Sequence, residues 1–336
     1  MENVVAIKPK LGFVGMGWIG KSRLKAIQAQ SDCDIFSAID PDTSAFEELK
    51  EENPGIQTHS SLQEMLLSDV DGIVIASPSA LHAKQCIKAL NSGKAVFCQK
   101  PLGRNKQETQ AVVEAAQANN LLLKVDFSYR YTAAVQQLKK VLESGELGHI
   151  YGANLVFHNA YGPDKEWYVN PDLSGGGCLM DLGIHLVDLL FWLFDDPTFN
   201  NHQSQYFYKG KPDFNPKKNV EDYATAQFVM DDETAIQLSC SWFLPAGKDA
   251  IIEAAFYGEN GGISFKNING SFYDFTTERY FGTKTETLVS PPDNWEGKAA
   301  VKWSEELCEG KTFDEEAFNY VKVAQEIETL YQSKIS

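Results

Sequence analysis

The sequence predicts an α/β fold of two domains, a doubly wound parallel sheet followed by a mainly antiparallel sheet. From residue 10 to about 126, short apolar runs alternate with longer amphipathic stretches, which is the pattern of successive βαβ units. From residue 149 onward, strand-like runs follow one another with one long helix among them. The length of 336 residues also suits two compact domains rather than one.

The first domain is expected to span residues 1–126. Its strands are apolar or β-branched runs that are each followed by turn residues, and helices fill most of the intervals between them. The expected strands are residues 11–14, 35–39, 72–76, 95–98 and 121–125.

The second domain is expected to span residues 127–314. After a helix at residues 133–143, which ends at Ser144-Gly145, the pattern changes to alternating strands. These strands are expected at residues 149–159, 223–230, 234–242 and 250–258.

Two further helices complete the prediction. One is expected at about residues 178–194, directly after three consecutive glycines. The other is the closing stretch 315–331, where apolar residues recur at helical spacing, so that an amphipathic helix is expected to pack back on the first domain.

The composition argues against nucleic acid and membrane as partners. The chain has 30 Lys plus Arg against 46 Asp plus Glu, and its formal net charge of −16 repels phosphate backbones and anionic lipid surfaces. The most apolar window, residues 186–194, is shorter than the about 20 residues that cross a bilayer core.

Six scattered cysteines, with no Cys/His cluster at zinc spacing, predict reduced thiols and no metal site. The N-terminal residues show no secretory signal. We therefore expect a soluble, cytoplasmic protein.

A glycine-rich loop directly follows the first expected strand. Residues Gly15, Gly17 and Gly20 form the pattern G-x-G-x-x-G, with Trp18 and Ile19 between the last two glycines. In this pattern the first glycine permits a tight turn, the second admits a pyrophosphate, and the third lets helix and strand pack closely. The alternative is a chance glycine-rich turn, but the strand before it and the helix after it favour nucleotide binding.

The second strand ends at Asp40, twenty positions after Gly20, where dinucleotide-binding folds place the acid that binds the adenosine ribose. Its charge would repel a 2′-phosphate, so NAD is expected rather than NADP. An acidic residue after a strand is also a common helix N-cap, and Asp42 is a rival for the same role.

The next loop at the same edge of the sheet contains Ser77 and Pro78, with His82 shortly after. Ligands of open α/β folds collect at this edge, so the loop is a candidate wall for the nicotinamide. The alternative is a proline-directed turn in which Ser79 caps the following helix.

Three residues are candidates for chemistry. Lys100 precedes a proline at the end of a buried strand, where the chain is biased towards an extended or turn conformation, although most lysines are ordinary surface residues. Asp181 and His185 follow the three glycines and are four residues apart, so on a helix they share one face. The alternative for this pair is that the two side chains satisfy each other at a helix–sheet interface.

Taken together, these residues resemble the glucose-fructose oxidoreductase, inositol dehydrogenase and rhizopine-catabolism (Gfo/Idh/MocA) family over essentially the whole chain. The resemblance rests on the loop at Gly15, the Ser77-Pro78 turn with His82, the lysine-proline pair, the GGG-x-x-x-D-x-G-x-H helix and the closing helix. The family's usual tripeptide is Glu-Lys-Pro, and this sequence has Gln99 in place of the glutamate.

The resemblance implies a Rossmann domain beside an open-faced antiparallel sheet, with the active site between them, and a homodimer or homotetramer built through the sheets. It implies hydride transfer between NAD(P) and a ring secondary alcohol of a sugar, cyclitol or glycoside. It makes Lys100, Asp181 and His185 the catalytic group.

In such a reaction a base must reach the substrate hydroxyl and a positive charge must stabilise the developing alkoxide. His185 suits the base, Asp181 would orient the imidazole or a neighbouring hydroxyl, and Lys100 would supply the charge.

The expected contacts follow from the motifs and the resemblance. The residues expected to bind the cofactor are Gly15, Gly17, Trp18, Ile19, Gly20, Asp40, Ser77, Pro78, His82, Gln99 and Lys100. The residues expected to contact the substrate are Tyr129, Arg130, Trp167, Tyr168, Asp181 and His185, with Tyr131 as a further candidate. For the aromatic residues, an interdomain core is the alternative.

Two other functions are compatible with this fold. One is a dinucleotide-binding transcriptional regulator without catalysis, which would be free to lose the lysine and the histidine. The other is an NAD-dependent glycosidase that oxidises its substrate transiently, and net release of NADH would separate it from a dehydrogenase.

Overall fold

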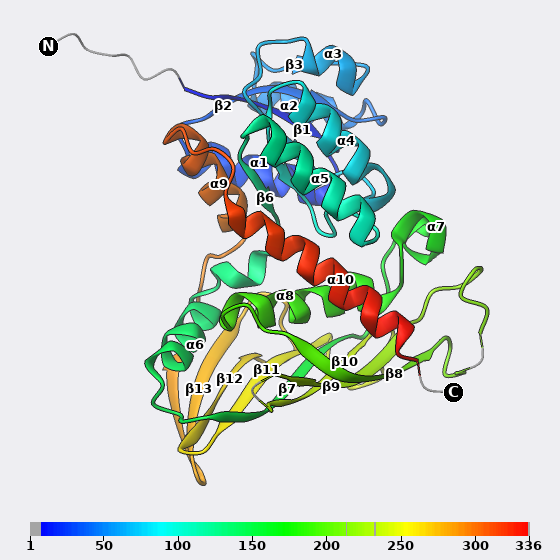
Figure 1. Cartoon of the computed structure of the whole chain (residues 1–336). Coiled ribbons are helices and arrows are strands. Elements are labelled where there is room, and N and C mark those ends of the chain that lie inside the picture. The colour runs from blue at the N-terminus through cyan, green and yellow to red at the C-terminus, as the bar shows by residue number, and fades with distance from the viewer. Residues whose placement is uncertain (1–7, 213, 232, 335–336) are drawn as a thin grey trace, which may run out of the picture. The chain divides into compact units, whose positions relative to one another are not determined.

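The computed structural model describes residues 8–212, 214–231 and 233–334, which form two compact units (Figure 1). The first unit holds the residues up to Ser128 together with Glu296–Val321, and the second holds Tyr129–Trp295 together with the residues from Lys322. The sequence-based division assigns residues 296–314 to the second domain instead. The reason for the difference is helix α9 (Lys298–Cys308), which packs on helix α1 and strand β5 of the first unit.

The first unit is built on a parallel sheet with the strand order β3-β2-β1-β4-β5-β6. The strands are β1 (Lys10–Val14), β2 (Asp34–Ile39), β3 (Gln57–Thr58), β4 (Gly72–Ile75), β5 (Ala95–Cys98) and β6 (Leu123–Val125). Strands β4 and β5 are buried throughout, as expected where helices cover both faces. The doubly wound parallel sheet is confirmed. Only β3 lacks a counterpart in the prediction, because its two residues are polar and exposed.

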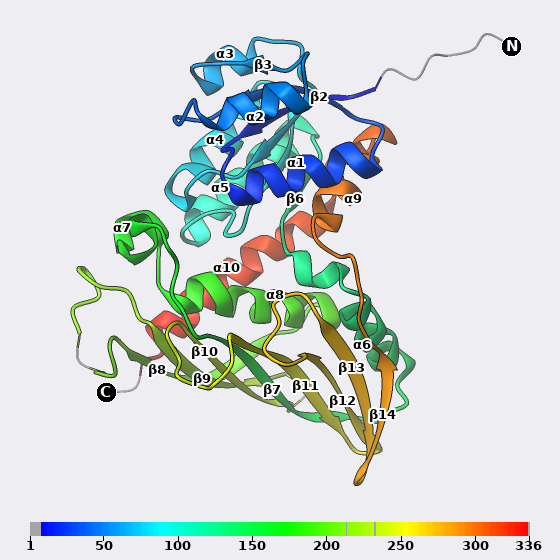
Figure 2. The ribbon, with the colours of Figure 1, turned by 180° about the vertical axis from the view of Figure 1, so that it is seen from behind.

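Helices cover both faces of this sheet, with α1 packing beside α9 on one face and α4 beside α5 on the other (Figures 1 and 2). The helices are α1 (Trp18–Gln30), α2 (Ala45–Glu52), α3 (Leu62–Leu66), α4 (Ser79–Asn91), α5 (Lys106–Asn119), α9 and the 3₁₀ turn η4 (Glu315–Ala317).

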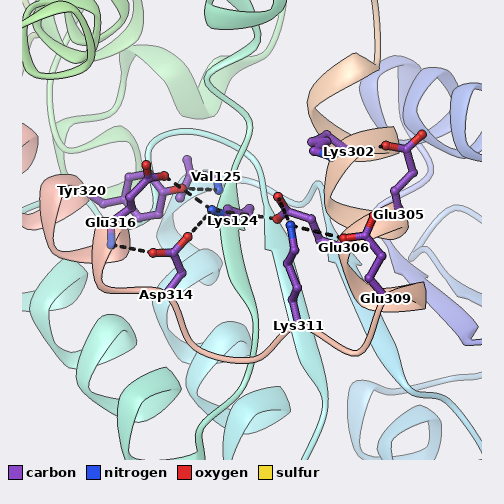
Figure 3. Close-up of polar contacts among 10 residues, drawn as sticks. All are labelled: Lys124, Val125, Lys302, Glu305, Glu306, Glu309, Lys311, Asp314, Glu316 and Tyr320. Carbon is purple, nitrogen blue, oxygen red and sulfur yellow. Dashed lines mark hydrogen bonds and ion pairs between the residues drawn. The ribbon is translucent and has the colours of Figure 1, made fainter.

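A cluster of charged side chains joins Lys124 of β6 to α9 and to the segment that follows it (Figure 3). The Nζ atom of Lys124 lies 2.9 Å from the carboxylate of Asp314, 3.6 Å from that of Glu316 and 3.9 Å from that of Glu306. Burial lowers the pKa of Lys124, but Tyr320 and the carboxylates outweigh burial and raise the pKa overall. This cluster helps to hold residues 306–320 in the first unit.

The second unit contains a sheet with the strand order β14-β13-β12-β11-β7-β10-β9-β8. Its strands are β7 (Ile150–Asn159), β8 (Phe199–Phe207), β9 (Tyr223–Met230), β10 (Ala235–Ser241), β11 (Ala250–Gly258), β12 (Gly261–Asn267), β13 (Phe275–Phe281) and β14 (Lys284–Val289). All neighbours pair antiparallel except β7 and β10, so the mainly antiparallel sheet is confirmed.

Four of these strands, β8 and β12 to β14, are missing from the sequence-based prediction. Strand β8 carries a polar sequence, β12 begins with two glycines, and four of the six residues of β14 are exposed. None of them shows the apolar alternation on which strand recognition depends.

Helical segments lie on one face of this sheet, and no helix among the described residues covers the other face (Figures 1 and 2). The segments are η1 (Ser128–Tyr131), α6 (Ala133–Ser144), η2 (Glu166–Val169), α7 (Pro171–Ser174), the π-helical turn η3 (Leu179–Gly183), α8 (Ile184–Leu193) and α10 (Phe318–Gln332). The closing helix is expected to pack back on the first domain, but its residues from Lys322 onward belong to the second unit.

The helix expected at 178–194 therefore begins with a π-helical turn before α8, which is a feature often found at functional sites. The whole run Pro171–Leu193 has the length and apolar composition of a membrane span, unlike the short window noted in the sequence. However, 89% of its most apolar part is buried inside the protein, as in a core helix.

His158 on β7 is a buried histidine among hydroxyl groups. Its Nδ1 lies 2.8 Å from the Oγ atom of Ser241 and its Nε2 lies 3.2 Å from the Oγ atom of Ser239. Burial lowers the pKa of His158 to about 4. The folded protein therefore holds this imidazole in its neutral form at neutral pH.

This histidine predicts a loss of stability in mild acid. The unfolded chain protonates a histidine below about pH 6.5, whereas the folded protein resists until about pH 4, so stability falls between those values. Between pH 7 and pH 5 we expect His158 to account for about 2 kcal/mol of the lost free energy of unfolding. Urea unfolding of His158→Gln at both pH values should show a loss of free energy of unfolding that is smaller than the loss of the parent protein by this amount. The exposed-site variant His149→Gln serves as the control and should retain the loss.

Candidate active site

Each glycine of the loop after β1 has its own spatial reason. Gly15 has a φ of +92°, and a Cβ atom there would lie 2.5 Å from the carbonyl oxygen of Ala76. A Cβ atom at Gly20 would lie 1.9 Å from the carbonyl oxygen of Gly15. Gly17, in contrast, faces open space and is the N-cap of α1, with no side chain that could cap the helix. The first-turn N–H groups of α1 are thus available to a phosphate, and the loop fits a dinucleotide.

Asp40 is joined to this loop. Its Oδ2 atom accepts a hydrogen bond of 2.5 Å from the main-chain N–H of Met16, and its Oδ1 atom accepts one of 2.8 Å from that of Asp42. The rival Asp42 instead accepts hydrogen bonds from the main chain and the hydroxyl of Ser44, in the turn before α2. Of the two acids, Asp40 is therefore the one that contacts the glycine loop.

The buried side chain of His82 contacts the loop after β4. This side chain is 1% exposed, with Nδ1 2.7 Å from the carbonyl oxygen of Pro101 and Nε2 2.6 Å from that of Ser77. Only the imidazolium form can donate to both oxygens. The pKa of His82 lies below its usual value, because burial and the charge of Lys100 lower it more than the two carbonyl contacts raise it. His82 thus joins the Ser77 loop to the lysine-proline turn. Because both ring nitrogens are used in these contacts, His82 would act on the cofactor indirectly, by positioning the two loops.

The remaining residues of this loop are placed as follows. The hydroxyl of Ser77 donates to Gln85 at 2.6 Å, and Pro78 is exposed. Helix α4 begins at Ser79 without a side-chain cap, so the alternative role of Ser79 as a capping residue is wrong.

Lys100 is half-buried at the end of β5, and the residue before it belongs to a buried polar network. The side-chain amide of Gln99 donates to Oδ2 of Asp126, and the Nε atom of Arg23 donates to the same oxygen at 2.6 Å. The side chains of Arg23 and Asp126 are only 6% and 0% exposed. The turn that carries Lys100 is thus anchored by a buried ion pair.

In the second unit, a buried carboxylate organises the start of the helix with the three glycines. Glu221 accepts hydrogen bonds from the N–H groups of Gly177 (3.1 Å) and Leu179 (3.0 Å) and from the hydroxyl of Tyr331 (2.8 Å). A Cβ atom at Gly177 would lie 1.9 Å from the carbonyl oxygen of Glu221, and one at Gly176 would lie 2.2 Å from the Tyr331 hydroxyl. Gly177 is therefore needed for the close approach of another backbone, and Gly176 for the close approach of the Tyr331 side chain.

Asp181 and His185 follow on this helix. The half-buried Asp181 accepts a hydrogen bond of 3.0 Å from the indole N–H of Trp242. His185 is 8% exposed, and its ring lies edge-to-face on Tyr129 with 5.0 Å between the centroids. Burial and the charge of Asp181 raise the pKa of Tyr129, so this ring lies near both predicted catalytic residues of the second unit.

The predicted substrate residues have mixed surroundings. Tyr129 packs among aromatic core side chains, including Phe157 and Trp295, and it supports the ring of His185. Arg130 forms an ion pair with the buried Asp188, 2.7 Å from Nε to Oδ2, and burial raises the pKa of Asp188 to about 6 although Arg130 lowers it. Both placements suit structural roles, and substrate contact by either side chain stays a prediction.

The other candidates remain accessible. The half-buried rings of Trp167 and Tyr168 stack on each other at 3.7 Å. Burial and, to a smaller extent, the charge of Asp181 raise the pKa of Tyr168. The candidate Tyr131 is half-buried in the turn η1.

Sequence reasoning missed Asp126, Glu221 and Trp242. Asp126 and Trp242 each come directly after a strand, which is a signal that could have been used. Glu221 lies in a polar loop and is identified only by its hydrogen bonds.

The fold and these residues agree with comparisons to known proteins. The model described as "Oxidoreductase family, NAD-binding Rossmann fold" matches residues 10–127, and the model described as "GFO/IDH/MocA C-terminal domain" matches residues 135–264. D-glucoside 3-dehydrogenase of Escherichia coli is 24% identical over 275 residues, which are 78% of each chain. Matches to some other relatives cover about half of their length.

Two solved structures show the same fold. A 3-ketoreductase from Actinomadura kijaniata in complex with NADP and TDP-benzene has a TM-score of 0.82 at 18% identity, with 97% of this chain and 98% of that chain covered. Levoglucosan dehydrogenase in complex with NADH and L-sorbose has a TM-score of 0.83 at 19% identity, with 97% and 96% covered. Both halves of the chain thus match one family, and the chain belongs to the Gfo/Idh/MocA family of NAD(P)-dependent oxidoreductases.

Proposed function

We propose that this protein is an NAD(P)-dependent dehydrogenase that transfers a hydride between the nicotinamide and a ring secondary alcohol of a sugar, cyclitol or glycoside. The observation that carries the proposal is the glycine loop, where Gly17 leaves room for a pyrophosphate at an uncapped helix N-terminus. The same chain retains Lys100, Asp181 and His185, the residues that the family resemblance makes catalytic.

When bound, the nicotinamide supplies the hydride acceptor for the carbinol carbon. Lys100 would stabilise the alkoxide that develops on the substrate oxygen by its charge. His185 would take the hydroxyl proton as general base. Asp181, held by the indole of Trp242, would orient the imidazole or a neighbouring substrate hydroxyl. In the reverse direction the proton transfer runs from His185 to the substrate.

A screen of monosaccharides, cyclitols, sugar acids and glycosides at alkaline pH tests this proposal, with NAD reduction followed at 340 nm as its readout. At least one compound is expected to give steady, stoichiometric NADH release. Conversion of a glycoside without net NADH would instead support the glycosidase, and binding of NAD without turnover of any compound would support the regulator.

For the cofactor, we propose NAD rather than NADP, because Asp40 brings a carboxylate to the glycine loop. In Asp40→Ala, NADP affinity should rise relative to NAD affinity by about tenfold, since a repulsion of about 1.4 kcal/mol is removed. Fluorescence titration with NADH and NADPH measures this ratio. Asp42→Ala is the matched control and should leave the ratio unchanged. A parent protein that prefers NADPH would contradict the proposal.

We further propose that the chain forms a homodimer or homotetramer through the face of the eight-stranded sheet that carries no described helix. This face has a groove of about 610 Å³ lined largely by polar side chains, among them Gln203, Gln227 and Glu253. Light scattering would give the molar mass.

The scattered cysteines favour a cytoplasmic location for the enzyme.

A further inference from the structure

The second unit contains a large, mostly apolar groove that the chemistry described above leaves unused. It has a volume of about 910 Å³, which is the size of a pocket for a drug-sized ligand. It is formed where β8 and β10 end and β9 begins, together with Val169 at the end of η2. Its lining includes four aromatic residues, Phe207, Tyr223, Trp242 and Phe243, of which Phe243 is 58% exposed and Trp242 is 3% exposed.

One hydrogen bond and one neighbour in the chain relate this groove to the predicted catalytic carboxylate. Trp242, which lines the groove, donates its indole N–H to Asp181 at 3.0 Å. Val169, which also lines the groove, directly follows Tyr168, whose pKa is raised by burial and by the charge of Asp181. The groove therefore adjoins a residue that holds the predicted catalytic carboxylate.

Phe243 lines the groove and has a strained backbone conformation. It is 58% exposed and has a φ of +61°, a left-handed conformation that is strained for a residue of this size. Its ring lies against Gly162, where a Cβ atom would come within 2.0 Å of Cζ. A large apolar ring held exposed on a strained backbone points to a ligand that covers it.

The chemistry of the walls selects the occupant. Aromatic faces and the side chains of Leu244 and Pro245 favour a flat apolar group over a second sugar, which would need many hydrogen-bond partners. Lys209, Lys218 and Asp222 lie in the lining too, so polar substituents of such a group have partners.

We propose that this groove binds the aglycone of a glycoside, so that the preferred substrate is a glycoside with an aromatic aglycone rather than a free sugar. This proposal rests on the proposed function and narrows its substrate class. The reacting sugar ring lies at Asp181 and His185, and the aglycone lies on the exposed ring of Phe243.

The test compares the methyl and phenyl glycosides and the matching disaccharide of the sugar that the screen identifies. The phenyl glycoside is expected to have a kcat/KM at least tenfold above that of the methyl glycoside and above that of the disaccharide. Phe243→Gly removes the ring and suits the positive φ, so it should fold and lower the phenyl-to-methyl ratio to about 2. Phe281→Ala is the control, because Phe281 is an exposed phenylalanine outside the groove, and it should keep the parent ratio.

Saturation-transfer NMR of the phenyl glycoside gives a readout that does not need turnover. Strong transfer to the phenyl protons in the parent, and its loss in Phe243→Gly, is expected. Equal kcat/KM for the methyl and phenyl glycosides, a preference for the disaccharide, or a ratio unaffected by Phe243→Gly would overturn the aglycone site. So would a lower molar mass of Phe243→Gly in light scattering, which would make the groove an interface between copies. If the screen turns over no compound, a set of phenyl glycosides of common sugars serves as the NMR probe instead. Transfer to the phenyl protons that Phe243→Gly abolishes would then show that the dehydrogenase proposal fails while the groove still binds an aromatic group.

Discussion

Replacing Lys100 by methionine is expected to lower kcat by a factor of about 10³ while changing the affinity for NADH less than threefold. The methionine side chain keeps the length and apolar stem of lysine but removes the charge that would stabilise the alkoxide. Steady-state kinetics and fluorescence titration with NADH measure the two quantities. Lys84→Met, on the exposed side of α4, is the matched control and should change neither. A parallel loss of NADH affinity would show that Lys100 acts mainly through its expected contact with the cofactor and not on the alkoxide.

The same variant tests whether Lys100 acts together with His185. Residues that serve one transition state lose their effects non-additively, because the second substitution has little left to remove. His185→Asn alone is expected to lower kcat by a factor of about 10² or more. The double variant should be only slightly worse than Lys100→Met. Strictly additive losses would show that the two side chains do not serve the same step.

The sequence predicted those parts of the fold that have a local pattern. Alternating apolar and amphipathic runs are sufficient to identify β1, β2, β4 and β5, because parallel strands covered on both faces must be apolar. The glycine loop was predictable because its spacing directly after a strand is a local pattern, and the structure leaves no room for a Cβ atom at Gly15 and Gly20. In contrast, β14 is largely exposed at the edge of its sheet, and pairing with β13 rather than its own composition makes it a strand.

The parts of the site that escaped prediction depend on contacts between distant residues. Glu221 is 42 residues from the N–H group of Leu179 that it binds, and Asp126 is 103 residues from Arg23. The position of Asp126 directly after β6 is the one local signal, and nothing in the polar loop around Glu221 marks that acid as buried. Trp242 similarly becomes significant only because its indole reaches Asp181. Such residues support the predicted ones and are visible only in the folded protein.

Restoring the family's glutamate in this chain, by Gln99→Glu, is expected to destabilise the protein by about 2 to 4 kcal/mol at pH 8. The reason is Asp126, whose Oδ2 atom accepts the amide hydrogen of Gln99 and is buried beside Arg23. A carboxylate at position 99 would face this oxygen within hydrogen-bond distance, and one guanidinium would have to balance two negative charges. The departure from the family pattern is thus matched by a buried acid elsewhere in the chain.

The destabilisation should depend on pH in a definite direction. Repulsion raises the pKa of the introduced carboxyl in the folded protein, so the variant approaches the parent below about pH 4 and loses stability as the pH rises. Urea unfolding at pH 5 and pH 8 measures this difference. Gln99→Met, which removes the hydrogen bond without adding charge, should cost about 1 to 2 kcal/mol at both pH values. Gln99→Glu combined with Asp126→Asn restores one acid and one amide beside Arg23, and should recover most of the loss at pH 8. If Gln99→Glu is as stable as the parent at pH 8, the amide is not matched to Asp126.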